Sequence, residues 1–91
     1  MNVAERFGDN LKRQRKLADL SQDDLAFRAS LHRTEISQLE RGLRHARVDT
    51  VAKLAGAIEI DPGKLFEGIA WEPGDLRRGR FKPERSEGPL P

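Results

Sequence analysis

Cysteine and tyrosine are absent from this chain of 91 residues, and aromatic residues make up only 5% of it. The lack of cysteine excludes disulfides and thiolate metal sites, although it leaves the redox compartment open. So few aromatic side chains argue against a single-strand binder that stacks bases on aromatic platforms. No apolar run approaches the roughly 18 residues of a membrane span, and the first residues, MNVAERFGDN, lack the apolar core of a signal peptide. We therefore expect one small, soluble, cytoplasmic domain.

The groupings that carry catalysis or hold cofactors are also missing. His32 and His45 are the only histidines, and no cysteine or carboxylate cluster accompanies them, so we expect no metal site. The serines have no histidine and aspartate arranged as a nucleophile signature. No glycine-rich loop is present to cradle a phosphate. The sequence therefore predicts neither an enzyme nor a bound cofactor.

Charge is unevenly distributed, although the net charge is only +2. Residues 1–47 carry ten Lys or Arg against seven Asp or Glu, and residues 48–76 carry two against six. Residues 77–91 are basic again, with five against two. This segregation indicates one side that faces a polyanion and another side that is turned away from it.

Apolar residues recur at helical spacing over most of the first 70 residues. The expected helices are Val3–Ala18, Gln22–Ala29, His32–Arg41, Val48–Ile58, and a short fifth helix that begins after Asp61 and ends near Gly68. The fourth of them carries the apolar repeat Val48, Val51, Leu54, Ala55 and Ile58. Ser21 and Asp24 form a near capping box at the start of the second helix, and Gly42 is suited to end the third. Asp61 and Pro62 are typical of a helix start.

The composition changes at Trp71. Residues 71–91 hold four of the five prolines and three of the eight glycines, so a long regular element is excluded there. The stretch GRFK, residues 79–82, is the one candidate for a short strand. We expect a domain over residues 1–70 and a short irregular tail over residues 71–91 that is either flexible or in contact with a second subunit.

Two interpretations of Trp71 are open. The indole either packs on the fourth and fifth helices or forms a dimer contact together with Ile60, Phe66 or Ile69. The basic part of the tail, Arg77 to Arg85, is expected to be a mobile arm that adds nonspecific affinity for DNA. Such an arm would steepen the dependence of binding on salt.

The stretch LHRTEISQLERG, residues 31–42, has an unusual polar face. Wound as a helix, it places Ile36, Leu39 and Glu40 on one side. The opposite side carries Arg33, Thr34, Ser37, Gln38 and Arg41. These side chains have hydrogen bonds to donate, in contrast to the Glu–Lys pairs of an ordinary solvent-exposed helix. Two short helices joined by a tight turn, with such a face on the second, form the plan of a helix-turn-helix unit over residues 21–41.

The match to a known family is longer than this unit. The motifs LSQDDLA, RTEISQLERG and L-A-x-A-I-x-I-D-x-x-x-L-F stand at residues 20–26, 33–42 and 54–66. With them the chain resembles the Cro/cI-type (XRE-like) helix-turn-helix family from Phe7 to Phe66. The resemblance implies an all-α, five-helix domain of the lambda-repressor type, whose third helix lies in the major groove of DNA.

The resemblance also implies roles for individual residues. The base-reading positions match His32, Arg33, Thr34, Ser37 and Gln38. The phosphate-binding positions match Gln22 at the start of the second helix, and Arg41, Arg44 and Arg47 after the third. Arg15 and Glu40 match a structural ion pair between the first and third helices. Asp19 and Ser30 depart from the family pattern, because glycine is usual at both positions.

The chemistry of these side chains suits DNA. Arg33 can donate two hydrogen bonds to O6 and N7 of guanine, and Gln38 can pair in the same way with adenine. Gln22 would add the positive end of its helix to a phosphate contact. The opposing interpretation is a merely solvated helix face and ordinary surface charge.

The sequence therefore predicts a sequence-specific regulator of transcription that binds double-stranded DNA and is associated with the nucleoid. The expected form is a repressor that acts as a homodimer on a palindromic operator. The alternative is an antitoxin that binds its own promoter and holds a toxin protein, with residues 71–91 folding on that partner. A third class, a protein-interaction module without DNA binding, is opposed by the face that carries Arg33 and Gln38.

Overall fold

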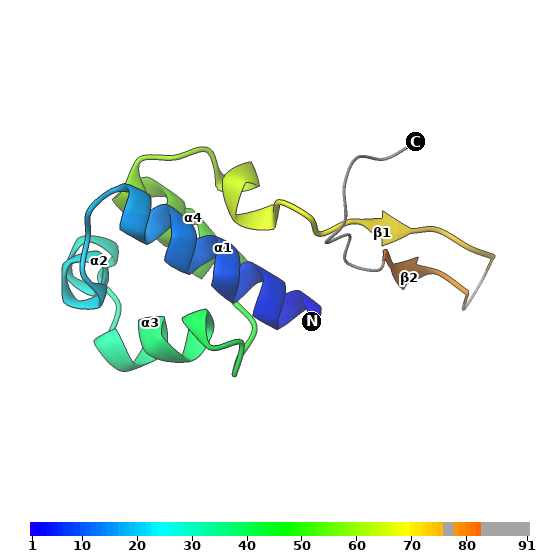
Figure 1. Ribbon diagram of the computed structural model, residues 1–91, viewed down its shortest axis with the longest axis horizontal. Coiled ribbons are helices and arrows are strands. Elements are labelled where there is room, and N and C mark those ends of the chain that lie inside the picture. The colour runs from blue at the N-terminus through cyan, green and yellow to red at the C-terminus, as the bar shows by residue number, and fades with distance from the viewer. Residues whose placement is uncertain (76–77, 83–91) are drawn as a thin grey trace.

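The computed structural model describes residues 1–75 and 78–82. Helices form one body, from which a small hairpin projects (Figure 1). The elements in chain order are α1 (Val3–Leu17), α2 (Gln22–Ala29), α3 (Arg33–Glu40), α4 (Val48–Ile58), the 3-10 helix η1 (Pro62–Phe66), β1 (Trp71–Glu72) and β2 (Arg80–Phe81). None of the helices in these residues is long and apolar enough to cross a membrane.

The helical part of the prediction is confirmed for four helices and wrong for the fifth. The bounds of α2 and α4 are those expected, whereas His32 and Arg41 cap α3 instead of belonging to it. The fifth element is a 3-10 helix of five residues. In it the Lys64 N–H bonds to the Asp61 carbonyl oxygen at 2.9 Å, the three-residue spacing that short helical segments favour.

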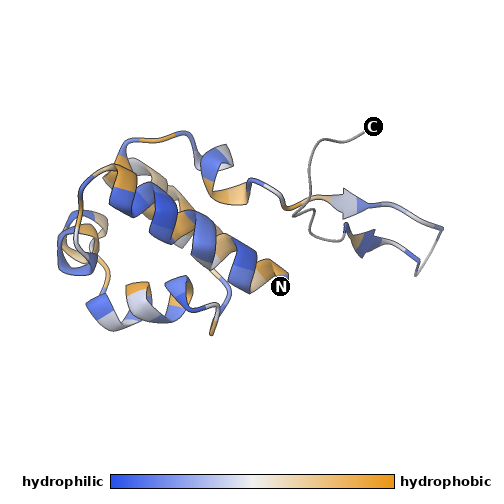
Figure 2. Ribbon diagram, viewed as in Figure 1, coloured by the Kyte–Doolittle hydropathy of each residue, from blue (hydrophilic) through white to orange (hydrophobic). Residues whose placement is uncertain are grey.

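The core lies where the four helices and η1 meet. Its fully buried large apolar side chains are Leu11, Leu25, Ile36, Leu39, Leu54 and Leu65, so each of these five elements contributes at least one. The helix α1 packs on α3 and η1, while α2 packs on α3 and α4. Hydrophobic and hydrophilic residues alternate along the helices, because each turns one face inward and another to solvent (Figure 2).

One buried polar residue, Asn10, joins the first and last helical elements. Its side chain is fully buried, and its Nδ2 donates to the carbonyl oxygens of Leu65 at 3.0 Å and Glu67 at 2.9 Å. A buried amide is costly unless it is hydrogen-bonded, so these two bonds hold the end of η1 on α1.

The turn between α2 and α3 is made without glycine. Ser30 has a φ of 57°, in the left-handed region, and Asp19 after α1 has a φ of 60°. The Leu31 N–H nevertheless closes the end of α2 by bonding to the Ala26 carbonyl oxygen at 2.9 Å. The helix-turn-helix geometry is therefore retained where the family pattern has glycine.

A hairpin replaces the start of the expected irregular tail. Its strands are antiparallel, with Trp71 opposite Phe81 and Glu72 opposite Arg80. The Trp71 and Phe81 rings pack edge to face, with centroids 5.1 Å apart. Trp71 is 55% exposed, which corrects the interpretation that its indole packs on the fourth and fifth helices. The candidate strand over residues 79–82 contains β2.

The remainder of the tail prediction lies mostly outside the described residues. Of the basic arm from Arg77 to Arg85, the structure describes residues 78–82, which include Arg78, Arg80 and Lys82. Arg80 is paired with Glu72 at 2.7 Å and Arg78 with Asp75 at 3.4 Å. The contribution of the arm to DNA affinity stays a prediction.

Candidate nucleic-acid interface

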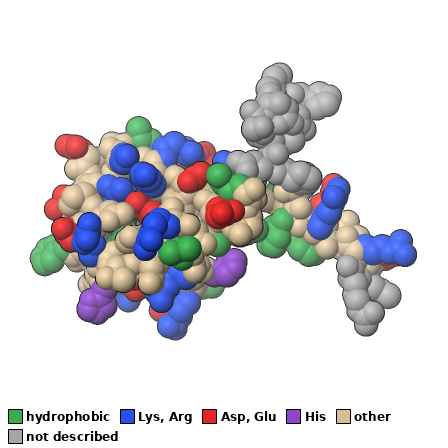
Figure 3. Space-filling view, turned by 60° about the horizontal axis from the view of Figure 1, so that its bottom comes forward, with side chains coloured by type: hydrophobic (Ala, Val, Ile, Leu, Met, Phe, Trp, Pro, Cys, Tyr) green, Lys and Arg blue, Asp and Glu red, His purple; other side chains and the backbone are tan. Residues whose placement is uncertain are grey.

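The outer face of α3 carries the polar side chains that the sequence singled out. His32, Arg33 and Thr34 are exposed, and Ser37 and Gln38 on the next turn are half-buried. The opposite face, with Ile36, Leu39 and Glu40, is buried against the other helices. Figure 3 views the molecule with the α3 side turned forward and shows Lys and Arg side chains spread over this face, with Asp and Glu among them.

Three of the predicted DNA-contacting arginines lie beside a carboxylate. The pairs are Arg33 with Asp23, Arg44 with Glu35, and Arg47 with Asp49, each at 3.5 Å. Five of the six side chains are exposed and Glu35 is partly buried, and ion pairs near the surface contribute only about 0–1 kcal/mol, because solvent and salt screen them. The three guanidinium groups can therefore exchange these partners for phosphates or bases at little cost.

Gln22 and Arg41 stand near opposite ends of the helix-turn-helix unit in the sequence, at the start of α2 and at the end of α3. Gln22 is the first residue of α2, and its side chain Nε2 donates to Glu40 Oε1 at 3.0 Å. Arg41 caps α3, and its Nε reaches the Ser37 carbonyl oxygen at 3.4 Å. The structure thus brings Gln22 to the end of α3, a contact that helical periodicity did not predict.

The ion pair between Arg15 and Glu40 is buried. Arg15 donates from Nε to Glu40 Oε2 at 2.6 Å and from Nη2 to Oε1 at 3.0 Å, in a fork-to-fork arrangement. Its third donor, Nη1, bonds to the Leu20 carbonyl oxygen at 2.8 Å. The hydrogen bond to Glu40 is the main cause that raises the pKa of Arg15 above its ordinary value. The pair ties α1 to the end of α3 and so helps to fix the orientation of α3.

Close packing of α1 against α3 depends on Gly8, which the sequence analysis did not single out. A Cβ atom at this position would lie 2.3 Å from the Leu39 carbonyl oxygen and 2.7 Å from that of Glu40. The available signal was a glycine in the middle of an expected helix, because such a glycine weakens the helix unless packing requires it.

The start of α2 is fixed by a reciprocal capping box. The Asp24 N–H donates to Ser21 Oγ at 2.9 Å, and the Ser21 N–H donates to Asp24 Oδ2 at 3.0 Å. The hydrogen bonds from Ser21 lower the pKa of Asp24. This stabilisation is present above the ordinary carboxyl pKa and is lost as the pH falls through the lowered one.

In residues 1–75 and 78–82, no three His, Cys, Asp or Glu side chains are grouped to hold a metal ion. The outer face of α3 presents guanidinium groups and other hydrogen-bond donors, a chemistry that suits binding.

Comparison with known proteins finds similarity over most of the chain. The model of a family described as helix-turn-helix (HTH_3) matches residues 11–65. The control protein C.BamHI of Bacillus amyloliquefaciens is 36% identical over 67 residues, which span 72% of this chain and 83% of that protein. The control protein C.SmaI of Serratia marcescens is 34% identical over 76 residues, which span 81% of this chain and 90% of that protein. The family match ends before the hairpin.

A solved structure supports the same assignment. The restriction-modification controller protein C.AhdI from Aeromonas hydrophila superposes with a TM-score of 0.68 at 38% sequence identity. The superposition covers 69% of this chain and 96% of that protein. The resemblance drawn from the sequence motifs is therefore confirmed: the chain belongs to the XRE family of helix-turn-helix, DNA-binding transcriptional regulators.

Proposed function

We propose that this protein reads a specific double-stranded DNA sequence through the outer face of α3. The observation that carries the proposal is the exposed polar face of a helix whose opposite face is buried and tied to α1 by an ion pair. Arg33 lies on the first turn and Gln38 on the second, where they can address neighbouring base edges. His32, Thr34 and Ser37 complete the proposed base-reading set.

The proposed phosphate contacts flank this helix. Gln22 stands at the N-terminus of α2, where the positive end of the helix adds to its own hydrogen bond. Arg41, Arg44 and Arg47 follow α3 and have exposed side chains. Contacts of this kind fix the register of the protein on the duplex and carry no sequence information.

Base reading is tested by selecting bound duplexes from a random pool with the parent protein and with the Arg33→Ala/Gln38→Ala variant. We expect an enriched motif that loses definition at particular positions in the variant, because each lost bidentate contact removes about 1–3 kcal/mol of discrimination. Arg13→Ala is the matched control, since Arg13 pairs with Glu67 on another part of the surface. A parent without an enriched motif, or a variant with an unchanged motif, would contradict base reading.

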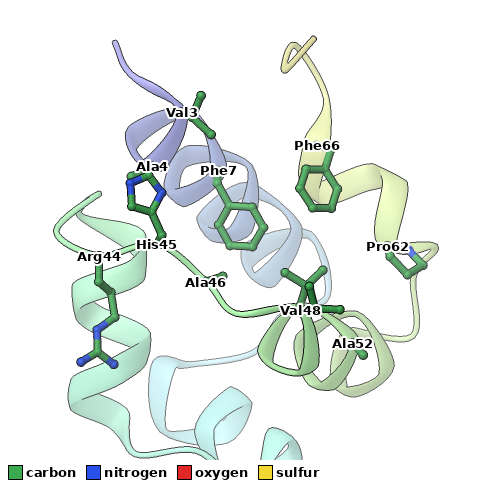
Figure 4. A pocket seen from close by; sticks show the side chains of 11 residues that line it. Val3, Ala4, Phe7, Arg44, His45, Ala46, Val48, Ala52, Pro62 and Phe66 are labelled. Carbon is green, nitrogen blue, oxygen red and sulfur yellow. The ribbon is translucent and has the colours of Figure 1, made fainter. Parts of the chain in front are cut away.

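We propose further that the protein acts as a homodimer, since one unit of this size reads few base pairs and a two-fold dimer spans half-sites about 34 Å apart. The proposed dimer surface is an apolar groove of about 460 Å³ (Figure 4). Phe7 and Phe66 meet edge to face in it, with ring centroids 5.7 Å apart. Val48 at its edge is 89% exposed, although the sequence placed it in an apolar repeat.

The dimer is tested by Val48→Asp, measured by sedimentation equilibrium. We expect the variant to be mostly monomeric at concentrations where the parent is dimeric, because a carboxylate would be desolvated in the interface. The fold is expected to survive, since Val48 is largely exposed in one chain. Leu17→Asp, at another exposed apolar residue, is the control. A parent that stays monomeric, or a variant as dimeric as the parent, would refute this surface.

The names of the relatives support a narrower proposal. C.BamHI and C.SmaI are control proteins, and C.AhdI is a restriction-modification controller. We propose that this protein controls, as a repressor, the expression of restriction-modification genes. The selected motif should then lie at a promoter of such genes in the source genome, and a reporter placed behind it should fall in output when the protein is present. None of the relatives reported above is named an antitoxin, so their names lend that alternative no support.

A further inference from the structure

The carboxylate of Glu40 has two partners from two different elements. Its Oε1 accepts from Arg15 Nη2 and from Gln22 Nε2, both at 3.0 Å, while its Oε2 accepts from Arg15 Nε at 2.6 Å. The Glu40 side chain is only 3% exposed. One buried carboxylate at the end of the reading helix therefore joins α1, α2 and α3.

This arrangement decides which end of the Gln22 amide faces inward. A carboxylate only accepts hydrogen bonds, so the amide nitrogen and not the amide oxygen has to face Glu40. An amide nitrogen carries two hydrogens, and Glu40 takes one of them. Within the described residues Gln22 makes no other side-chain hydrogen bond, which leaves the second N–H available for an acceptor such as a phosphate oxygen.

The ion pair does not need Gln22. Arg15 alone presents two donors to the two carboxylate oxygens and satisfies the charge of Glu40. The third bond to Glu40 is therefore in excess of what the fold requires, and its direct effect is to restrict the rotation of an amide at the N-terminus of α2.

We propose that Glu40 is a positioning residue for the DNA backbone contact of Gln22. Its carboxylate orients the amide so that nitrogen is the donor offered to phosphate, and it thereby couples the grip on the backbone to the position of the reading helix. This inference rests on the proposed function, because it takes Gln22 as a phosphate contact. Removing the carboxylate frees the amide to rotate, so Gln22 then contributes little to DNA affinity.

A double-mutant cycle tests the coupling, with Gln22→Ala, Glu40→Gln and the double variant. The readout is the fluorescence anisotropy of a labelled duplex that carries the selected motif, at a temperature where circular dichroism shows every variant folded. We expect Gln22→Ala to weaken binding about tenfold in the parent, as for the loss of one charge-assisted hydrogen bond. In the Glu40→Gln background we expect less than about a twofold effect, because an amide at position 40 both donates and accepts.

The control cycle pairs Gln22→Ala with Arg28→Gln. Arg28 is also on α2, but it bonds to the Ala57 carbonyl oxygen and to Glu59. The fold-changes in DNA affinity from Arg28→Gln and Gln22→Ala should therefore simply multiply in the double variant. If Glu40→Gln does not fold, Glu40→Asp replaces it: the shorter side chain moves the carboxylate away from Gln22 and from Arg15 Nη2, which share Oε1, but it keeps a negative charge near the Arg15 guanidinium.

The outcomes separate the inference from the proposed function. An equal loss from Gln22→Ala in both backgrounds would overturn the positioning role and leave DNA reading intact. No loss from Gln22→Ala in the parent would overturn both the phosphate contact and the positioning role. A parent that selects no motif would overturn the proposed function itself.

Discussion

Gly8→Ala is expected to destabilise the protein by about 1–3 kcal/mol or more, whereas Gly56→Ala is expected to stabilise it by about 0.5–1 kcal/mol. At Gly8 the added methyl would meet the Leu39 carbonyl oxygen at 2.3 Å, and backbone cannot turn aside as a side chain can. At Gly56 nothing lies within 4 Å of the added carbon. Both glycines are in helices, so the gain in helix propensity is the same and only the packing differs.

The measurement is urea unfolding followed by far-ultraviolet circular dichroism, which reports the helices. The two variants should move the unfolding midpoint in opposite directions from the parent. Because Leu39 and Glu40 belong to α3, we also expect Gly8→Ala to weaken DNA binding under conditions where it is still folded. A raised or unchanged midpoint for Gly8→Ala would show that α1 and α3 are not in the close contact described above, and a lowered midpoint for Gly56→Ala would contradict the prediction at that position.

Glu40→Ala is expected to cost about 3–5 kcal/mol of the free energy of unfolding, because it leaves the Arg15 guanidinium buried without its counter-charge. The side chains of the pair are 9% and 3% exposed, so water does not replace the lost partner. Stability and DNA binding should fall together, since the same carboxylate holds the end of α3. Thermal unfolding of parent and variant measures the effect, and an unchanged melting temperature would contradict it.

Glu67→Ala is the control for this loss. Glu67 pairs with Arg13 at 3.0 Å, but both side chains are about half exposed. An ion pair at the surface contributes about 0–1 kcal/mol. A comparable loss of stability in both variants would mean that burial does not increase the contribution of the Arg15–Glu40 pair to the free energy of unfolding.

Helix positions followed from the sequence because they depend on local signals. The spacing of apolar residues and the Ser21–Asp24 capping box are enough to place α2 and its neighbours. The prediction of the fifth helix was wrong because Asp61 and Pro62 are equally typical of the start of an α-helix and of a 3-10 helix. The hairpin was mostly missed because each of its strands has two residues, too few for an alternating pattern.

The candidate site followed the same division. The sequence assigned Arg33 and Gln38 to an outer face, and the structure shows Arg33 exposed and Gln38 half-buried there, while their roles toward DNA stay predictions. The link from Gln22 to Glu40 was not predicted, because it joins residues 18 positions apart whose rotamers depend on tertiary packing. Val48 fitted the apolar repeat of α4 but lies at the edge of the body, where periodicity alone does not distinguish core from surface.

The fluorescence of Trp71 reports on the hairpin and not on the helical part of the protein. This residue is the only tryptophan, it lies on the hairpin against Phe81, and it is more than half exposed. Its fluorescence therefore reports on the hairpin, while far-ultraviolet circular dichroism at about 222 nm reports on the helices. Unfolding curves recorded by the two signals should therefore not coincide. An apparent intermediate between them would be a state in which the helices are still folded and the hairpin has opened.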